Sequence, residues 1–210
     1  MIKRTSFKHG WWYHYCVHNK KKERLLCDDL QKLNDFLDRM FEECPHDYFQ
    51  NGSRGSKLKF ILPNLNIDHT EKHPICYLTG QALEINGERF KDNHMKVQRF
   101  MLEHDQHTVA MEVPVWLMPE EFGSFSGRFD SEYPLTGHID LVRVEDGKIW
   151  VWDYKPGAIR EKYAATQTYF YALMLSKRTG IPIDHFMCGW FDSYNCYTFK
   201  PERKELKEFR

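Results

Sequence analysis

The dipeptide Asp146-Gly147 separates two apolar segments and constrains the fold more than any other feature of the sequence. Asp-Gly is a preferred two-residue hairpin turn, because both positions of a type I′ turn need positive φ. Counting outward from this turn pairs the residues of the two strands one by one, and Asp140 then falls directly opposite Asp153. The turn therefore predicts two carboxylates side by side on one face of an antiparallel hairpin.

Two carboxylates in this arrangement repel each other, because directly opposed residues have Cβ atoms only ~4.5–5.5 Å apart. A bound divalent metal ion would offset the repulsion, and hard oxygen ligands favour Mg²⁺ or Mn²⁺. Lys155 lies two residues after Asp153, so strand alternation places it on the same face. Its ammonium would position a water nucleophile or offset negative charge on a phosphate. The alternative is an exposed hairpin with ordinary surface charges, since a single Asp-x-Lys is frequent by chance.

The other face of the second strand carries Trp150, Trp152 and Tyr154, which we expect in the hydrophobic core. The pattern thus predicts one face for chemistry and one for packing.

The rest of the chain predicts alternating helices and strands of an α/β (α+β mixed) fold. Two helices are expected at residues 94–104, capped by Asp92-Asn93, and at 161–178. Strands are expected at residues 57–62, 108–117, 135–145, 148–154, 185–191 and 196–199, with a further hairpin across Asn86-Gly87.

The N-terminal region is expected to form a mainly helical lobe, because apolar residues recur at helical spacing between residues 25 and 41. The polar segment 51–56 predicts a boundary between this lobe, residues 1–56, and a second domain, residues 57–210. Four aromatic residues near the start would stack on unpaired bases or belong to the core: Trp11, Trp12, Tyr13 and Tyr15.

Three short motifs together resemble a known family. Gly137-His138-Ile139-Asp140, Trp152-Asp153-Tyr154-Lys155-Pro156 and Gln167-x-x-x-Tyr171 are similar to the motifs of the RecB-like branch of the PD-(D/E)xK nucleases, which includes CRISPR-associated RecB-like exonucleases. The resemblance covers residues 90–200 or so and implies a restriction-endonuclease-like αβββαβ core with a central mixed sheet flanked by helices. It also implies phosphodiester hydrolysis that depends on Mg²⁺ or Mn²⁺.

The resemblance assigns a role to each motif residue. Asp140 and Asp153 would hold the metal with the backbone carbonyl of Tyr154, and Lys155 would assist the attacking water. Gln167 and Tyr171, one helical turn apart, would orient DNA or the groups of the active site. Without the resemblance they would be a polar residue at a helix–sheet seam and a core tyrosine.

Three further residues are candidates for the same site. Relatives carry a metal-binding histidine on the helix before the first core strand, which here is His94 or, less favoured, His104. A histidine on the apolar face of a helix is otherwise a core residue. Glu112 on the first core strand could reach the site or could be an acid at a strand edge.

Composition restricts the protein class less than the motifs do. The chain has 30 basic residues (Lys and Arg) and 30 acidic residues (Asp and Glu), so its net charge argues neither for nor against a nucleic-acid partner. The sequence predicts neither an apolar membrane span of ~18–20 residues nor a secretory signal, so we expect an intracellular protein with its six cysteines reduced. Many relatives bind an iron–sulfur cluster through four cysteines, but only Cys188 and Cys196 lie late in this chain, and we expect no cluster.

These features favour a nuclease that acts on DNA single strands or ends in repair, recombination or replication, with a repair or replication protein as a partner. One alternative is a site-specific or structure-specific endonuclease on the same core. Another is a non-catalytic nucleic-acid-binding or assembly subunit that has kept the fold, although an intact Asp140, Asp153 and Lys155 set argues against it.

Overall fold

The computed structural model describes residues 1–129 and 132–202. Its α-helices are α1 (Asn19–Leu25), α2 (Gln31–Arg39), α3 (Pro74–Ile85), α4 (Asn93–His104) and α5 (Ala164–Thr179). Its strands are β1 (Ile2–Arg4), β2 (Phe7–His9), β3 (Trp11–Tyr13), β4 (Cys16–His18), β5 (Asp68–Glu71), β6 (Thr108–Leu117), β7 (Leu135–Glu145), β8 (Lys148–Tyr154), β9 (Phe186–Phe191) and β10 (Asn195–Phe199).

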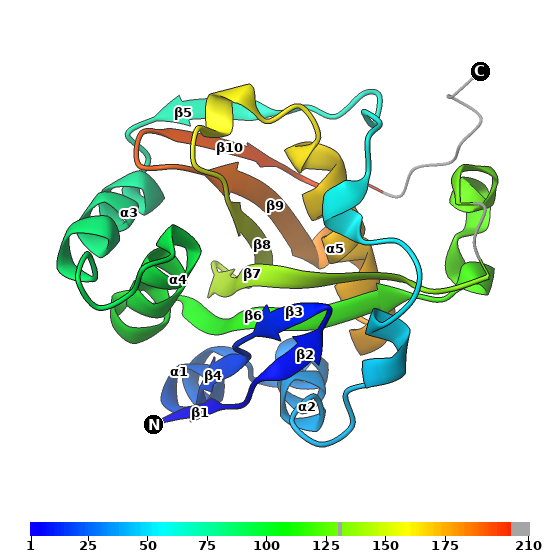
Figure 1. Ribbon diagram of the computed structural model, residues 1–210, viewed down its shortest axis with the longest axis horizontal. Helices are drawn as coiled ribbons and strands as arrows, with labels where there is room; N and C mark the ends of the chain where they lie inside the picture. The colour runs from blue at the N-terminus through cyan, green and yellow to red at the C-terminus, as the bar shows by residue number, and fades with distance from the viewer. Residues whose placement is uncertain (130–131, 203–210) are drawn as a thin grey trace.

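One eight-stranded mixed sheet forms the centre of the molecule, in the order β1-β4-β6-β7-β8-β9-β10-β5 (Figure 1). Its neighbouring strands run antiparallel except β8 and β9, which are parallel and are connected through α5. Strands β2 and β3 form a separate hairpin that lies over β6 and β7 in Figure 1. This mixed sheet flanked by helices confirms the predicted restriction-endonuclease-like fold class.

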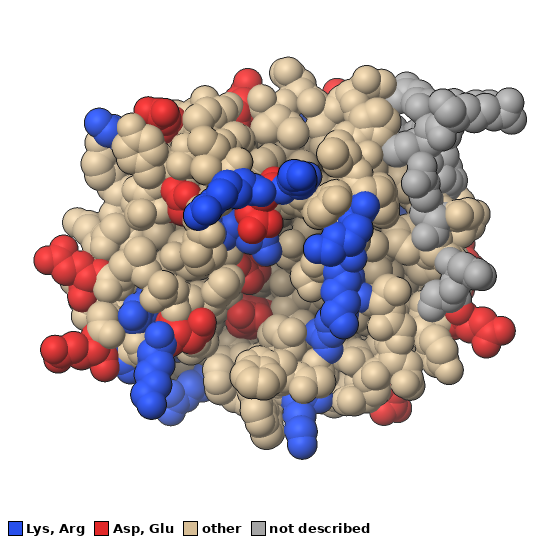
Figure 2. All heavy atoms as spheres, turned by 45° about the horizontal axis from the view of Figure 1, so that its top comes forward, with Lys and Arg blue, Asp and Glu red and all other residues tan. Residues whose placement is uncertain are grey.

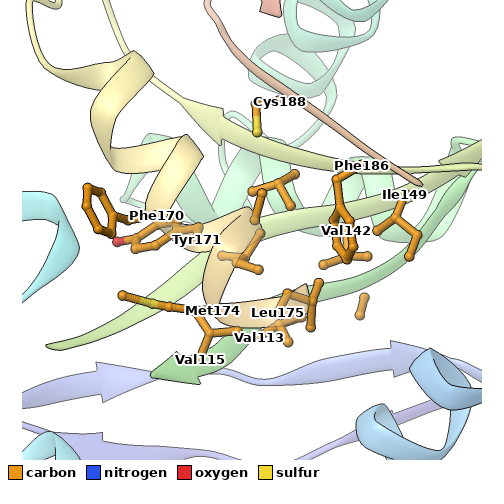
Figure 3. Packing of buried hydrophobic residues seen from close by; sticks show 14 of the residues in the cluster. Val113, Val115, Val142, Ile149, Phe170, Tyr171, Met174, Leu175, Phe186 and Cys188 are labelled. Atoms are coloured by element: carbon orange, nitrogen blue, oxygen red, sulfur yellow. The ribbon is translucent and has the colours of Figure 1, made fainter. Parts of the chain in front are cut away.

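Helices cover both faces of the central sheet. Helix α5 packs against β6, β7, β8 and β9, and α2 packs on α5, whereas α3 and α4 pack on each other and against the remaining face. Figure 3 shows Met174 and Leu175 of α5 beside Val113 of β6, and Val142 beside Phe186. Burial of such aliphatic and aromatic side chains contributes roughly 1.5–3 kcal/mol each, so α5 is fixed firmly over the strands that carry the motifs.

The predicted turn and its register are confirmed. Asp146 and Gly147 have φ values of 51° and 70°, as a type I′ turn requires. The ladder of β7 and β8 runs from Glu145↔Lys148 to Leu141↔Trp152, which is the register counted from the turn. Trp152 and Tyr154 are buried in the core beneath α3 and α4, as expected.

The elements around the motifs also agree with the sequence prediction. Helix α4 begins after Asp92, whose carboxylate accepts a hydrogen bond from the Met95 backbone N–H, and β6, β7 and β8 have the predicted bounds. Helix α5 begins three residues later than predicted, at Ala164, and ends at Gly180 in a left-handed conformation.

The hairpin predicted across Asn86-Gly87 is wrong, because residues 74–85 form helix α3. Pro74 at the first helical position and the His73 side chain, which accepts from the Ile75 N–H, start this helix. Asn86 then caps its C-terminus. Asn-Gly ends helices as well as turning hairpins, and the short apolar run before it fits either structure.

One prediction for the N-terminal third is also wrong. The segment 57–62 is irregular rather than a strand, although Leu58 and Leu62 are buried in the core. Residues 1–18 contain four short strands, and the helices of this region follow the aromatic start, beginning at Asn19.

The N-terminal region shares the sheet with the motif-bearing region. Strand β4 pairs with β6 at Cys16↔Met111 and Val17↔Ala110. One core cluster joins Phe36 and Phe49 to residues of β6, β7 and α5. The proposed segments 1–56 and 57–210 therefore meet in one sheet and one core; of the second, residues 130–131 and 203–210 lie outside the described residues. A search of the described residues finds no helix with the length and apolar character of a membrane span.

Candidate active site

A pocket of about 520 Å³ opens where β6, β7 and β8 meet α4 and α5. It collects most of the residues singled out from the sequence: His94, Glu112, Asp140, Asp153, Lys155, Gln167 and Tyr171. The exposed His104, at the C-terminal end of α4, is not among its lining residues. His104 lies at the surface where α4 ends, with its ring beside Phe100, so it does not reach the pocket.

Asp140 lies at the point where β7 and β8 begin to separate. The last ladder pair before it is Leu141↔Trp152, and the Asp140 Oδ2 then accepts a hydrogen bond from the Tyr154 N–H at 2.9 Å. Asp140 is 8% exposed and lines the pocket. Burial, and next the nearby Asp153, raise the pKa of Asp140 to about 6.

Asp153 is held by two different partners. Its Oδ1 accepts a hydrogen bond from Gln167 Nε2 at 2.9 Å, and its Oδ2 lies 2.7 Å from Lys155 Nζ. Burial alone would lower the pKa of Lys155, but Asp153 and Asp140 outweigh it and the pKa is raised. Lys155 is therefore an ammonium group at neutral pH, which can donate hydrogen bonds but cannot act as a base.

Glu112 brings a third carboxylate to the pocket from the middle of β6. Its backbone has φ of 53°, a left-handed conformation that costs a non-glycine residue roughly 1–2 kcal/mol. Its Oε1 accepts a hydrogen bond from Gln98 Nε2 at 2.6 Å. Burial, and next Asp140, raise the pKa of Glu112 well above its usual range. A strained backbone beneath an acid whose pKa is raised is characteristic of functional sites.

Tyr171 explains why a glycine begins the motif Gly137-x-x-Asp140. The Tyr171 ring packs directly on Gly137, where a Cβ would come within 2.2 Å of the Tyr171 Cε1. A similar approach at Gly55 would bring a Cβ within 2.5 Å of the same atom. The Tyr171 hydroxyl lies 3.3 Å from Gln167 Nε2. The glycine, the tyrosine and the glutamine thus form one packed unit that fixes Asp153.

A family model described as the PD-(D/E)XK nuclease superfamily matches residues 68–194 of the chain. The protein belongs to the PD-(D/E)XK nuclease superfamily. Its members are metal-dependent nucleases, so the carboxylates of the pocket can be examined as metal ligands. Searches of curated proteins and of solved structures return no match to the chain.

The pocket of this superfamily member fits a divalent cation. Glu112 Oε2 is buried, and within the described part of the chain it has no hydrogen-bond partner. Lys155 forms an ion pair with Asp153, while Asp140 and Glu112 add two more acids in the same pocket. Buried carboxylate oxygens without partners are costly unless a cation binds them, and hard oxygen donors select Mg²⁺, Mn²⁺ or Ca²⁺.

Part of the pocket lining comes from residues that the sequence did not assign to the site. Tyr13 stacks on His138 with ring centroids 3.6 Å apart, and Arg54 Nη1 donates to the Tyr13 hydroxyl at 3.2 Å. Trp11 and Trp12 at the start of β3 also line the pocket and are 76% and 55% exposed. These residues come together through contacts between distant parts of the chain. In the sequence, only the run of aromatic residues from Trp11 to Tyr13 pointed to them.

Proposed function

We propose that this protein is a Mg²⁺- or Mn²⁺-dependent deoxyribonuclease of the RecB-like branch that cuts DNA at single strands or ends. The observation that carries the proposal is the pair of buried acids, Asp140 and Asp153, in one pocket with the Lys155 ammonium. The motif that begins at Gly137 and the Gln167-Tyr171 pair support the RecB-like assignment.

Each side chain has a defined task in this proposal. Asp140, Asp153 and Glu112 would hold the metal, together with the Tyr154 carbonyl and His94, which lines the same pocket. When bound, the metal supplies a Lewis acid that activates water and stabilises the phosphate charge.

The remaining polar residues position these groups. Lys155 donates hydrogen bonds to the attacking water or to a phosphate oxygen, since it stays protonated. Gln167 fixes the Asp153 carboxylate through its 2.9 Å hydrogen bond, and Tyr171 supports Gln167. In this arrangement Gln167 and Tyr171 are positioning residues rather than groups that touch DNA.

The preference for unpaired DNA rests on the β2–β3 hairpin. Trp11 and Trp12 expose large ring surfaces at the mouth of the pocket, and Arg54 lines the same pocket. Aromatic faces beside a basic group bind unpaired bases, because every base can stack while duplex DNA hides its faces.

Basic side chains beside the pocket support a path for the DNA backbone. A second groove, lined by Arg4, Arg89 and Arg99, shares His14 and Met95 with the catalytic pocket. On the face drawn in Figure 2, acidic side chains lie near the middle with separate stripes of Lys and Arg around them. Basic flanks would hold phosphates while the acids hold the metal. A helicase or other replication or repair protein would supply such single strands.

The test is single-turnover digestion of end-labelled linear single-stranded DNA with Mn²⁺ or Mg²⁺. We expect cleavage by the wild type, loss of cleavage in Asp153→Ala and Lys155→Ala, and slower cleavage of blunt duplex DNA. His104→Ala, outside the pocket, is the matched control and should cut like the wild type. Cleavage that survives both active-site substitutions would refute this site. A folded wild type that binds DNA without cutting it would instead indicate a non-catalytic binding subunit.

A further inference from the structure

A second group of metal-binding side chains lies next to the catalytic pocket, at the turn end of the β2–β3 hairpin. His9 ends β2, Cys44 follows α2, and His46 begins the short 3-10 helix His46–Phe49. One donor atom from each lies within 4.8 Å of the other two. We call these three residues the histidine–cysteine cluster.

The two imidazoles of the cluster already face each other. His9 Nε2 lies 2.9 Å from His46 Nδ1, while the other ring nitrogen of His9, Nδ1, lies 2.9 Å from Nε2 of His138. Metal-binding histidines characteristically use one nitrogen for the metal and give the second N–H to a neighbouring acceptor. His9 takes this arrangement in the tautomer whose Nδ1–H donates to His138 Nε2.

The surroundings of the cluster are mainly aromatic. His9 and Cys44 are buried, and His46 is exposed on the open side. Phe49 stacks on His9 with centroids 4.1 Å apart, and Phe7 packs against His46 at 5.1 Å. Such walls hold the donor atoms in place and leave one side open to a water molecule.

We propose that His9, Cys44 and His46 bind one Zn²⁺ ion, with water as the fourth ligand of a tetrahedral site. Two imidazoles and a thiolate are the donor types that Zn²⁺ takes, whereas Mg²⁺ and Mn²⁺ prefer the oxygen donors of the catalytic pocket.

The position of the cluster assigns the ion a structural task. It would join β2 to the segment after α2, and through His138 it would reach β7 two residues before Asp140. The same hairpin carries Trp11 and Trp12 over the catalytic pocket. The zinc ion would therefore fix the hairpin that forms one wall of the active site, without taking part in the reaction itself.

The test is the zinc content of the full-length protein, produced in zinc-supplemented medium and desalted without chelator, measured by elemental analysis. We expect about one zinc per chain in the wild type and less than a tenth of that in His46→Asn and Cys44→Ser. Cys27→Ser, which alters an exposed cysteine, and His104→Asn are matched controls that should keep the zinc. Because His46 is exposed, its variant should fold even if Cys44→Ser does not, and circular dichroism would check both.

A second arm separates this site from the catalytic carboxylates. The double variant Asp140→Asn/Asp153→Asn should retain one zinc per chain, and Co²⁺ added to the zinc-free protein should give a thiolate-to-cobalt absorption band that Cys44→Ser lacks. A wild type without stoichiometric zinc and without that band would overturn the proposal, as would zinc that leaves in Asp140→Asn/Asp153→Asn but stays in His46→Asn. These readouts do not depend on nuclease activity, so the zinc site and the proposed function can fail separately.

Discussion

The carboxylate centre (Glu112, Asp140 and Asp153) and the histidine–cysteine cluster lie on either side of His138 but organise their donor atoms differently. Each carboxylate is held by its own partner: Gln98, the Tyr154 N–H, or Gln167 with Lys155. The nitrogen and sulfur atoms of the cluster instead converge within 4.8 Å. Like charges must be kept apart and neutralised until a cation arrives, whereas neutral imidazoles can approach by sharing a proton.

The largest expected effect is the loss of DNA cleavage in a variant of the carboxylate centre. Asp140→Asn should reduce the single-turnover cleavage rate by ~1,000-fold or more, because it removes a charged ligand from a buried metal site. Its zinc content should not change. Cleavage within tenfold of the wild type would remove Asp140 from the catalytic centre.

The next effect concerns stability of the metal-free protein. The pKa of Asp140 is about 6 in the folded chain against 3.8 for an ordinary Asp, so the folded state holds a proton that the unfolded state has lost between these values. Wild-type stability should therefore fall as pH rises from 4 to 6, by about 2–3 kcal/mol relative to Asp140→Asn.

Urea unfolding in EDTA at several pH values would measure this difference. Adding Mn²⁺ at neutral pH should restore the stability of the wild type and leave Asp140→Asn unchanged. Equal pH profiles for the two proteins would contradict the repulsion described for the carboxylate centre.

Gly137→Ala tests the packing that supports the carboxylate centre. The new methyl group would collide with the Tyr171 ring, and overpacking of this kind costs about 1–3 kcal/mol. Thermal unfolding would measure the loss. Gly80→Ala is the matched control, because no atom lies within 4 Å of the new Cβ and alanine favours helix α3. A Gly137 variant as stable as the control would show that the ring can move aside.

A smaller change in cleavage is expected for Gln167→Ala. Loss of its hydrogen bond to Asp153 should slow cleavage by ~10–100-fold, the usual effect of removing a residue that orients a metal ligand. Tyr171→Phe should cost less, since it removes only the 3.3 Å contact to Gln167 and keeps the ring on Gly137. The reverse order of these two effects would place Tyr171, rather than Gln167, next to the reacting groups.

The smallest effect concerns the β2–β3 hairpin, which contributes residues both to the catalytic pocket and to the histidine–cysteine cluster. Trp12→Ala in the Asp140→Asn background should weaken binding of single-stranded DNA by about tenfold, as loss of one stacked base would. Fluorescence anisotropy would measure it, and Tyr77→Ala, which alters an exposed ring on α3, is the control. Removal of zinc should weaken DNA binding as Trp12→Ala does and leave the single-turnover cleavage rate of the wild type unchanged, if the cluster acts through the hairpin.

The sequence was most informative where the contacts are local. The Asp146-Gly147 turn determined the register of β7 and β8, and the capping residue Asp92 and the apolar spacing placed α4 and β6. These features depend on neighbours in the chain or on one hairpin, so residue type and spacing suffice to predict them.

Long-range packing was beyond the same reasoning. The left-handed φ of Glu112 depends on the surrounding strands, and the histidine–cysteine cluster joins residues 9 and 44–46. Cys44-Pro45-His46 was a local signal for a metal site, but it supplies only two ligands and the third comes from β2. The incorrect prediction of a hairpin at Asn86-Gly87 arose from local sequence rather than from a missed long-range contact, because the short pattern there fits both a helix end and a turn.

The pairing of β4 with β6 has a consequence for how the chain can be divided. Nearly all of β6 is buried, and Phe36 and Phe49 lie against its Trp116. A fragment that began at residue 57 would lack this cover and would expose the edge of β6 that pairs with β4 at Ala110 and Met111. Such an edge recruits other chains, so the fragment should aggregate even though it contains every motif of the nuclease. We therefore expect the N-terminal segment to prevent self-association through the edge of β6.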